Sequence, residues 1–121
     1  MILVDTSVWI SHLREGNKKL SVLLSEAQVL CHPLIIGELA CGNLKNRLNI
    51  LSLLQSLPIV ITATHEDVMQ FIENYKLMGQ GLGYIDVHLL ASALLTDAHF
   101  WTLDKKLHEA CTKLGLCSGQ R

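Results

Sequence analysis

Four acidic residues, Asp5, Glu38, Asp86 and Asp104, adjoin apolar segments of this chain and could supply oxygen ligands. Asp5 ends the run MILVD, and Asp104 ends HFWTLD. Glu38 interrupts PLIIGELACG, and Asp86 follows the glycine-bracketed GLGYID before the apolar VHLLASALL. Carboxylates are costly in apolar surroundings unless something compensates their charge. Four such acids, far apart in the chain, predict that one shared group balances their negative charge, and the simplest such group is a bound divalent cation.

The chemistry that such a site favours is hydrolysis of a phosphodiester. Clustered carboxylates raise one another's pKa, and a hard cation removes that repulsion. Ligands that are all oxygen atoms favour Mg²⁺ or Mn²⁺ over Zn²⁺. Such an ion lowers the pKa of an attacking water and stabilises the leaving oxygen, so no protein nucleophile is needed. Taken singly, Asp5, Asp86 and Asp104 could each be a helix cap, and Glu38 could be a solvated helix position.

The elements that must position these acids alternate between strands and helices. Strands are expected at 1–5, 29–32, 58–61 and 100–103, and helices at 6–14, 18–27, 33–41, 46–56, 64–78, 86–95 and 105–114. Thr6 or Ser7 could cap the first helix, Thr64 begins a capping-box pattern, and Gly115 is a natural stop. This alternation predicts an α/β fold with a parallel sheet. Ligands of such sheets bind beyond the carboxyl ends of the strands, where Asp5 and Asp104 are expected.

Length and composition restrict the class of protein further. The 121 residues suit one domain, 1–121, and no apolar run is long enough to span a membrane. The net charge of −1 argues against a passive nucleic-acid binder. The four cysteines form no C-x2–4-C pair, so we expect reduced thiols in a cytoplasm rather than a zinc site. Half of the residues are apolar, which predicts apolar surface that a partner or second copy covers.

Four segments together resemble the PIN-domain ribonucleases, specifically the VapC-like toxins of toxin–antitoxin pairs: MILVDTSVWISHLR, HPLIIGELACGNL, GYIDVHLLASALL and FWTLDKKL. The resemblance covers nearly the whole chain. It implies a three-layer α/β/α sandwich with a four- or five-stranded parallel sheet. It also implies a Mg²⁺- or Mn²⁺-dependent endoribonuclease whose catalytic acids are Asp5, Glu38, Asp86 and Asp104. Asp5, Asp86 and Asp104 would bind the ion, and Glu38 would act through water or position the nucleophile.

The resemblance also implies supporting residues and partners. Thr6 and Thr102 match hydroxyl residues that orient ligands or waters around the metal. Such toxins form homodimers and are inhibited by a cognate antitoxin that occupies the groove near the site. Nearby basic residues could contact the RNA backbone, although each could equally be a solvated surface charge: Arg14, Lys45, Arg47, Lys105 and Lys106. Relatives often carry an acid at the position of Ser11 and a basic residue at that of Leu103.

Two other classes of protein remain as alternatives. The chain could be a non-catalytic PIN-fold module that binds RNA or a protein partner through the acidic groove. It could also be a phosphoryl-transfer domain of the receiver or haloacid-dehalogenase type. The receiver type needs paired acids early in the chain, and the dehalogenase type needs a second acid where Ser7 stands. The sequence does not identify the RNA, the antitoxin or the preferred metal.

Overall fold

A short parallel sheet lies at the centre of the computed structural model, which describes residues 1–117. The strands are β1 (Ile2–Val4), β2 (Val29–Leu30) and β3 (His99–Trp101), in the order β2-β1-β3. Leu3 is in register with Leu30 on one side and with Phe100 on the other. All three β1 residues are buried, as their uninterrupted apolar run predicts for a parallel strand covered on both faces. The predicted α/β fold with a parallel sheet is therefore confirmed.

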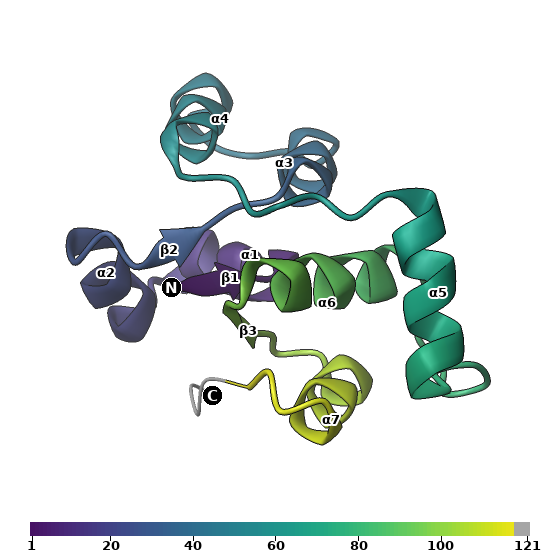
Figure 1. Ribbon diagram of the computed structural model, residues 1–121. Helices are drawn as coiled ribbons and strands as arrows, with labels where there is room; N and C mark the ends of the chain where they lie inside the picture. The colour runs from purple at the N-terminus through teal and green to yellow at the C-terminus, as the bar shows by residue number, and fades with distance from the viewer. Residues whose placement is uncertain (118–121) are drawn as a thin grey trace.

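Seven helices make up most of the described chain. They are α1 (Thr6–Glu15), α2 (Lys18–Ser25), α3 (Pro33–Ala40), α4 (Arg47–Ser56), α5 (His65–Tyr75), α6 (Tyr84–Thr96) and α7 (Lys105–Lys113). In Figure 1, α3 and α4 lie on one side of the strands and α7 on the opposite side. Helix α6 is buried at every residue of 87–93, because it is apolar nearly all round. Helix α5 stands at the edge of the molecule, against α6.

The predicted strand at 58–61 is wrong, because this segment forms only one bridge, between Ile59 and Cys31. Val60 N–H still bonds to Cys31 O at 3.1 Å. The next backbone donors turn to helix α6: Ile61 N–H bonds to Thr96 Oγ1 at 2.9 Å, and Ala63 N–H bonds to Ser92 Oγ at 3.0 Å. The pairing with β2 therefore ends at Val60, and side chains of α6 bind the backbone donors of Ile61 and Ala63. A second single bridge, Phe100 to Cys117, lies at the opposite edge of the sheet.

The helix boundaries follow local sequence signals with two exceptions. Thr64 forms the predicted capping box with Asp67, and Gly115 has the left-handed φ of +71° expected at a helix stop. Thr6 and Ser7 do not cap α1, because Asp5 takes the capping position and both hydroxyl groups bond elsewhere. Helix α6 begins at Tyr84, so Asp86 lies in its first turn instead of at its cap.

Two further points concern the extent of the chain. No helix within residues 1–117 is long and apolar enough to cross a membrane. The last four residues of the predicted domain 1–121 lie outside the described part of the chain.

Candidate active site

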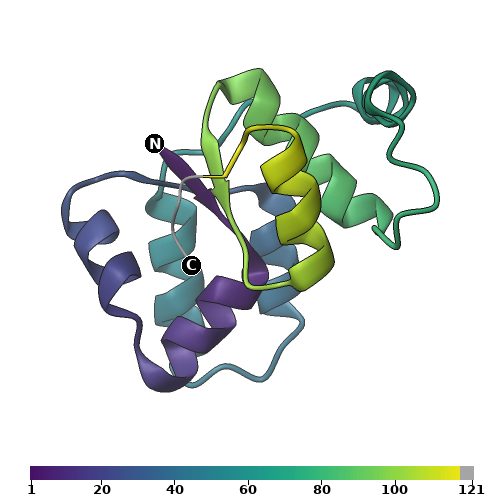
Figure 2. The same ribbon diagram turned by 90° about the horizontal axis from the view of Figure 1, so that it is seen from below.

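The register of the sheet brings Asp5 and Thr102 together. Val4 pairs with Trp101 at the ends of β1 and β3, so the next residues of the two strands are neighbours. Asp5 N–H continues the ladder to Trp101 O at 2.9 Å. Thr102 Oγ1 donates to Asp5 Oδ2 at 2.7 Å, and both residues are buried. Figure 2 shows that β1 runs into α1 and β3 runs toward α7 at this same end of the strands. Thr102 therefore contacts Asp5 directly, and its role in orienting a metal ligand stays a prediction.

Ser7 is a site residue that the sequence reasoning missed. Its hydroxyl donates to Asp5 Oδ2 at 2.7 Å and accepts from Leu103 N–H at 3.0 Å. Asp5 Oδ2 therefore receives two hydroxyl donors, and α1 is tied to the segment after β3. The signal was present in the run Asp5-Thr6-Ser7, because the second residue after a strand-ending acid can turn back toward it. The sequence did not predict that Ser7 contacts Asp5.

Asp104 lies at the start of α7 and serves as its cap. Its Oδ1 accepts from Leu107 N–H at 2.9 Å, while its own N–H donates to Thr102 Oγ1 at 3.0 Å. Thr102 thus connects the backbone of Asp104 to the carboxylate of Asp5. The capping alternative for Asp104 is correct, but it uses only one carboxylate oxygen. The same residue can therefore cap the helix and offer Oδ2 to a ligand.

Asp86 experiences the charge of the two other aspartates. Burial raises the pKa of Asp86 most, the hydrogen bond from Gly83 N–H lowers it in part, and the negative charges of Asp5 and Asp104 raise it further. The bond from Gly83 N–H to Asp86 Oδ2 is 3.1 Å long. The three aspartates, which are far apart in sequence, therefore form one electrostatic group. Such a group is a common mark of a functional site.

Glu38 joins this end of the molecule through Thr6. Thr6 Oγ1 donates to Glu38 Oε1 at 2.8 Å, which connects α1 to α3. Thr6 was expected to support the metal ligands, and it contacts Glu38 instead of Asp5. Glu38 is exposed, as its solvated alternative predicted, yet its position is fixed by this bond. His32, at the start of α3, accepts Leu34 N–H on Nδ1 at 3.0 Å and so caps the helix that carries Glu38.

The donor set suits a hard cation. Asp5, Asp86 and Asp104 each use one carboxylate oxygen in a local hydrogen bond, and the other oxygen accepts none from the residues described. In residues 1–117, no three His, Cys, Asp or Glu side chains already converge at coordinating distance. Mg²⁺ does not need such a cage, because it usually keeps several waters, and carboxylates that do not touch the ion can bind it through those waters. The shared negative charge and the free oxygens therefore fit the ion.

The five basic residues predicted to contact the RNA backbone lie in different parts of the structure. Lys105 and Lys106 directly follow Asp104, at the start of α7. A Cβ at Gly81 would lie 2.8 Å from Lys106 Nζ, so this ammonium group rests on the loop before α6. The glycine is required there, because its φ is also +77°. By contrast, Arg14 lies at the far end of α1, about 13 Å along the helix from its start.

Arg47 and Lys45 belong to the segment between α3 and α4. The Arg47 guanidinium donates to Ala40 O through Nη2 at 2.8 Å and through Nε at 3.2 Å. This pairing closes the loop after α3 and engages two of its donors. Lys45 is exposed in the same loop. The two lysines of α7 are therefore the basic residues best placed beside the acids.

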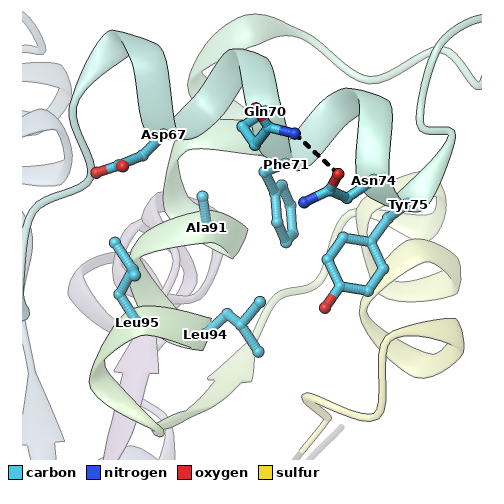
Figure 3. Close-up of a pocket in the computed structure, with 8 residues that line it drawn as sticks. All are labelled: Asp67, Gln70, Phe71, Asn74, Tyr75, Ala91, Leu94 and Leu95. Atoms are coloured by element: carbon cyan, nitrogen blue, oxygen red, sulfur yellow. Dashed lines mark hydrogen bonds between the residues drawn. The ribbon is translucent and has the colours of Figure 1, made fainter.

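A groove between α5 and α6 is separate from the acid group. Figure 3 shows its lining, which is largely apolar and comes from both helices: Asp67, Gln70, Phe71, Asn74, Tyr75, Ala91, Leu94 and Leu95. Its volume is about 190 Å³. None of the four acids lines it, so this groove is not the acid site.

Comparisons with known proteins agree with the fold. Residues 2–113 match the PIN domain family, and the chain belongs to that family. Among curated proteins it is similar to Ribonuclease VapC32 of Mycobacterium tuberculosis, found in two strains of that organism. The identity is 46% over 117 residues, which cover 96% of this chain and 94% of the relative. The chain is thus a VapC-type PIN-domain protein.

Proposed function

We propose that this protein is a metal-dependent endoribonuclease and the toxin of a toxin–antitoxin pair. The observation that carries the proposal is the electrostatic group of Asp5, Asp86 and Asp104 beyond the ends of the parallel strands. The similarity to a protein named Ribonuclease VapC32 supports RNA as the substrate. The absence of an ion pair to these three carboxylates within residues 1–117 leaves their charge available for a bound cation.

Asp5, Asp86 and Asp104 would hold Mg²⁺ or Mn²⁺, with waters completing the coordination. When bound, the ion lowers the pKa of a water and stabilises charge on the phosphate. Thr102 and Ser7 orient the carboxylate of Asp5 through Oδ2 and leave Oδ1 for the ion. Glu38, fixed by Thr6 and exposed to solvent, would accept a proton from or position the attacking water. No protein side chain forms a covalent bond to the RNA.

Lys105 and Lys106 are the proposed contacts to the RNA backbone. Both are exposed at the start of α7, beside Asp104. A phosphate approaching the metal would meet these ammonium groups, and the first turn of a helix also favours an anion. Lys105→Ala should weaken RNA binding with little effect on metal affinity. Lys106→Ala would in addition loosen the loop at Gly81.

The proposed partners are a cognate antitoxin and a second copy of the chain. The antitoxin would bind beside the acids, at a place other than the groove between α5 and α6. Tyr75, Leu94 and Leu95, which border the groove of Figure 3, are 46%, 38% and 47% exposed and could be covered in a homodimer. Light scattering of the wild type and of Leu95→Glu would measure the oligomeric state. A monomeric wild type would exclude the homodimer and leave the nuclease proposal intact.

We further propose that the domain occupies residues 1–121 and has the PIN-like three-layer arrangement. In that arrangement, Ile59 and Cys117 take the places of outer strands in a five-stranded sheet, each through its single bridge.

The proposal is tested by incubating the purified chain with RNA of defined sequence in Mg²⁺ or Mn²⁺, with and without EDTA. We expect cleavage only with the divalent ion, and none for Asp5→Asn. Asp97→Asn is the matched control, because Asp97 is an exposed acid in a left-handed conformation that Asn accepts equally well. Cleavage that survives EDTA or Asp5→Asn would exclude the metal mechanism. Tight RNA binding without turnover in any divalent ion would favour the non-catalytic module.

A further inference from the structure

Two cysteines, Cys111 and Cys117, lie on either side of the turn that ends helix α7. Leu116 N–H bonds to Cys111 O at 3.0 Å, and Gly115 N–H bonds to Thr112 O at 3.1 Å. These two bonds, with Gly115 at φ +71°, make a Schellman turn. The turn reverses the chain at the residue before Cys117. The spacing C-T-K-L-G-L-C therefore returns the second cysteine toward the first.

Both cysteines meet at the same residue of strand β3. Cys111 Sγ lies 3.6 Å from Phe100 O. Phe100 N–H donates to Leu116 O at 2.8 Å, and Phe100 and Cys117 form a parallel bridge. The helix end and the returning segment thus approach Phe100 from two directions. Cys117 Sγ lies against His108 and Thr112, which flank Cys111 on one face of α7, so the two thiols lie close together. Burial, and then the interaction with the Cys117 thiol, raise the pKa of Cys111.

The two thiols have different surroundings. Cys111 is fully buried, whereas Cys117 is half-buried and can meet a small molecule from solvent. Cys117 Sγ lies 3.6 Å from His108 Nδ1 and 3.4 Å from Thr112 Oγ1. The Thr112 hydroxyl already donates to His108 O at 2.9 Å, so its oxygen is an acceptor toward the thiol. Cys117 therefore has a proton acceptor, and Cys111 has no direct access to solvent.

We propose that Cys111 and Cys117 form an oxidisable thiol pair that closes to an intramolecular disulfide when the chain meets a hydroperoxide. Cys117 Sγ attacks the peroxide, its proton passes through His108 to the departing oxygen, and the O–O bond breaks. The products are an alcohol or water and a sulfenic acid on Cys117. The Cys111 thiol then attacks this sulfur, the S–S bond forms, the S–O bond breaks, and water leaves with the Cys111 proton. The two thiols are oxidised by two electrons and the peroxide is reduced by two.

The remaining cysteines make a useful contrast. Cys31 is buried, and its Sγ lies 3.9 Å from His32 O. Cys41 is exposed at the end of α3. Neither is brought to another thiol in the way that Cys111 and Cys117 are. No three-ligand group in residues 1–117 combines these sulfur atoms with His108, so a disulfide fits the pair better than a bound metal.

The disulfide would fasten the returning segment over the outer edge of the sheet. Strand β3 is an edge strand, and its backbone donor at Phe100 is covered by this segment. Unprotected edge strands are prone to pair with other chains. In the reduced protein, hydrogen bonds would hold this segment against the edge of β3. In the oxidised protein, the disulfide would hold the segment in addition. Cytosolic disulfides of this kind are transient and serve redox sensing.

The test treats the full chain with hydrogen peroxide, alkylates free thiols and digests without reduction. Trypsin cuts after Lys106 and Lys113, so the disulfide joins peptide 107–113 to peptide 114–121. Cys31 and Cys41 fall together in peptide 20–45 and are distinguished from the pair. We expect the joined peptides to become the main oxidised species, to separate on reduction, and to raise the Tm by several degrees. Cys41→Ser should behave like the wild type.

Two variants make the outcome decisive. Cys117→Ser should give no joined peptide and no rise in Tm on oxidation. Cys111→Ser should leave a sulfenic acid on Cys117 that a dimedone probe captures. The proposal is overturned if Cys117 proceeds to sulfinic acid in the wild type without cross-linking. It is also overturned if mixing isotope-labelled and unlabelled chains shows that the joined peptides come from two molecules.

Discussion

Replacing Thr102 by valine should disconnect Asp5 from the rest of the acid group. Thr102 is 3% exposed, and its hydroxyl makes two bonds: it donates to Asp5 Oδ2 at 2.7 Å and accepts from Asp104 N–H at 3.0 Å. Valine has nearly the same shape but cannot make either bond. The variant therefore leaves a buried carboxylate with one hydroxyl donor, Ser7, and a backbone N–H without its acceptor.

The cost can be worked from these two bonds. A hydrogen bond to a charged group contributes about 1.5–3 kcal/mol, and a lost neutral bond costs about 1 kcal/mol. The extra methyl group of valine offsets a part of this sum. We expect the free energy of unfolding to fall by about 3 kcal/mol. Because Asp5 also loses its orientation, we expect metal affinity to fall by roughly 10–100-fold, as for other residues that orient metal ligands.

Urea denaturation in EDTA measures the first effect, and RNA cleavage over a Mg²⁺ titration measures the second. Thr102→Ser keeps the hydroxyl and should recover most of both losses. Thr62→Val is the matched control, because Thr62 is exposed and should change stability by less than about 0.5 kcal/mol. If Thr102→Val unfolds within about 1 kcal/mol of the wild type and keeps its Mg²⁺ dependence, the assigned role of the hydroxyl is wrong.

Three further predictions concern other groups of the site and its supporting core. Asp104→Ala should lose RNA cleavage, and it should lose about 1 kcal/mol of stability because the cap of α7 is removed. Asp104→Asn should lose cleavage but keep its stability. If both variants lose the same stability in urea denaturation, Asp104 does not cap α7 through its side chain. Burial, and then the charge of His88, lower the pKa of His32 from 6.5 to about 4, so the unfolded chain binds this proton first. As the pH falls from 6.5 to 4, the free energy of unfolding of the wild type should therefore fall by about 3 kcal/mol more than that of His32→Asn. If the two free energies change by the same amount with pH, this prediction is wrong. The raised pKa of Asp86 has the opposite effect on stability: the free energy of unfolding should fall as the pH rises above the ordinary value of 3.8. Asp86→Asn, which carries no charge, should not show this fall. Added Mg²⁺ should stabilise the wild type more than Asp86→Asn, which thermal unfolding measures.

Two buried histidines, His32 and His88, connect the helices that carry two of the acids. His32 Nδ1 accepts Leu34 N–H, so Nε2 carries the hydrogen and donates to Ser92 Oγ at 3.1 Å. The ring of His88 packs edge-on against His32 with centroids 5.1 Å apart. His88 is buried among the core residues of α6. These contacts join α3, which carries Glu38, to α6, which carries Asp86.

Local patterns were sufficient for most of the helices and strands. Periodicity, the Thr64 capping box and Gly115 predicted most helices to within a few residues. They failed at 58–61, where β-type residues follow a proline but the backbone donors bond to Ser92 and Thr96 of α6. No local pattern could reveal these bonds, because their acceptors lie about thirty residues further along the chain.

The sequence by itself determined that Asp5 and Asp104 follow parallel strands, that Asp86 and Glu38 begin or interrupt apolar helices, and that no competing motif explains them. Tertiary structure decided which atoms meet. Strand register brings the hydroxyl groups of Thr102 and Ser7 to the Asp5 carboxylate. The packing of the helices brings Thr6 to Glu38, and places Asp86 where the negative charges of Asp5 and Asp104 act on it. The physical reason is range: caps and periodicity depend on neighbours along the chain, whereas hydrogen bonds and charge interactions of a site depend on strand pairing between distant segments.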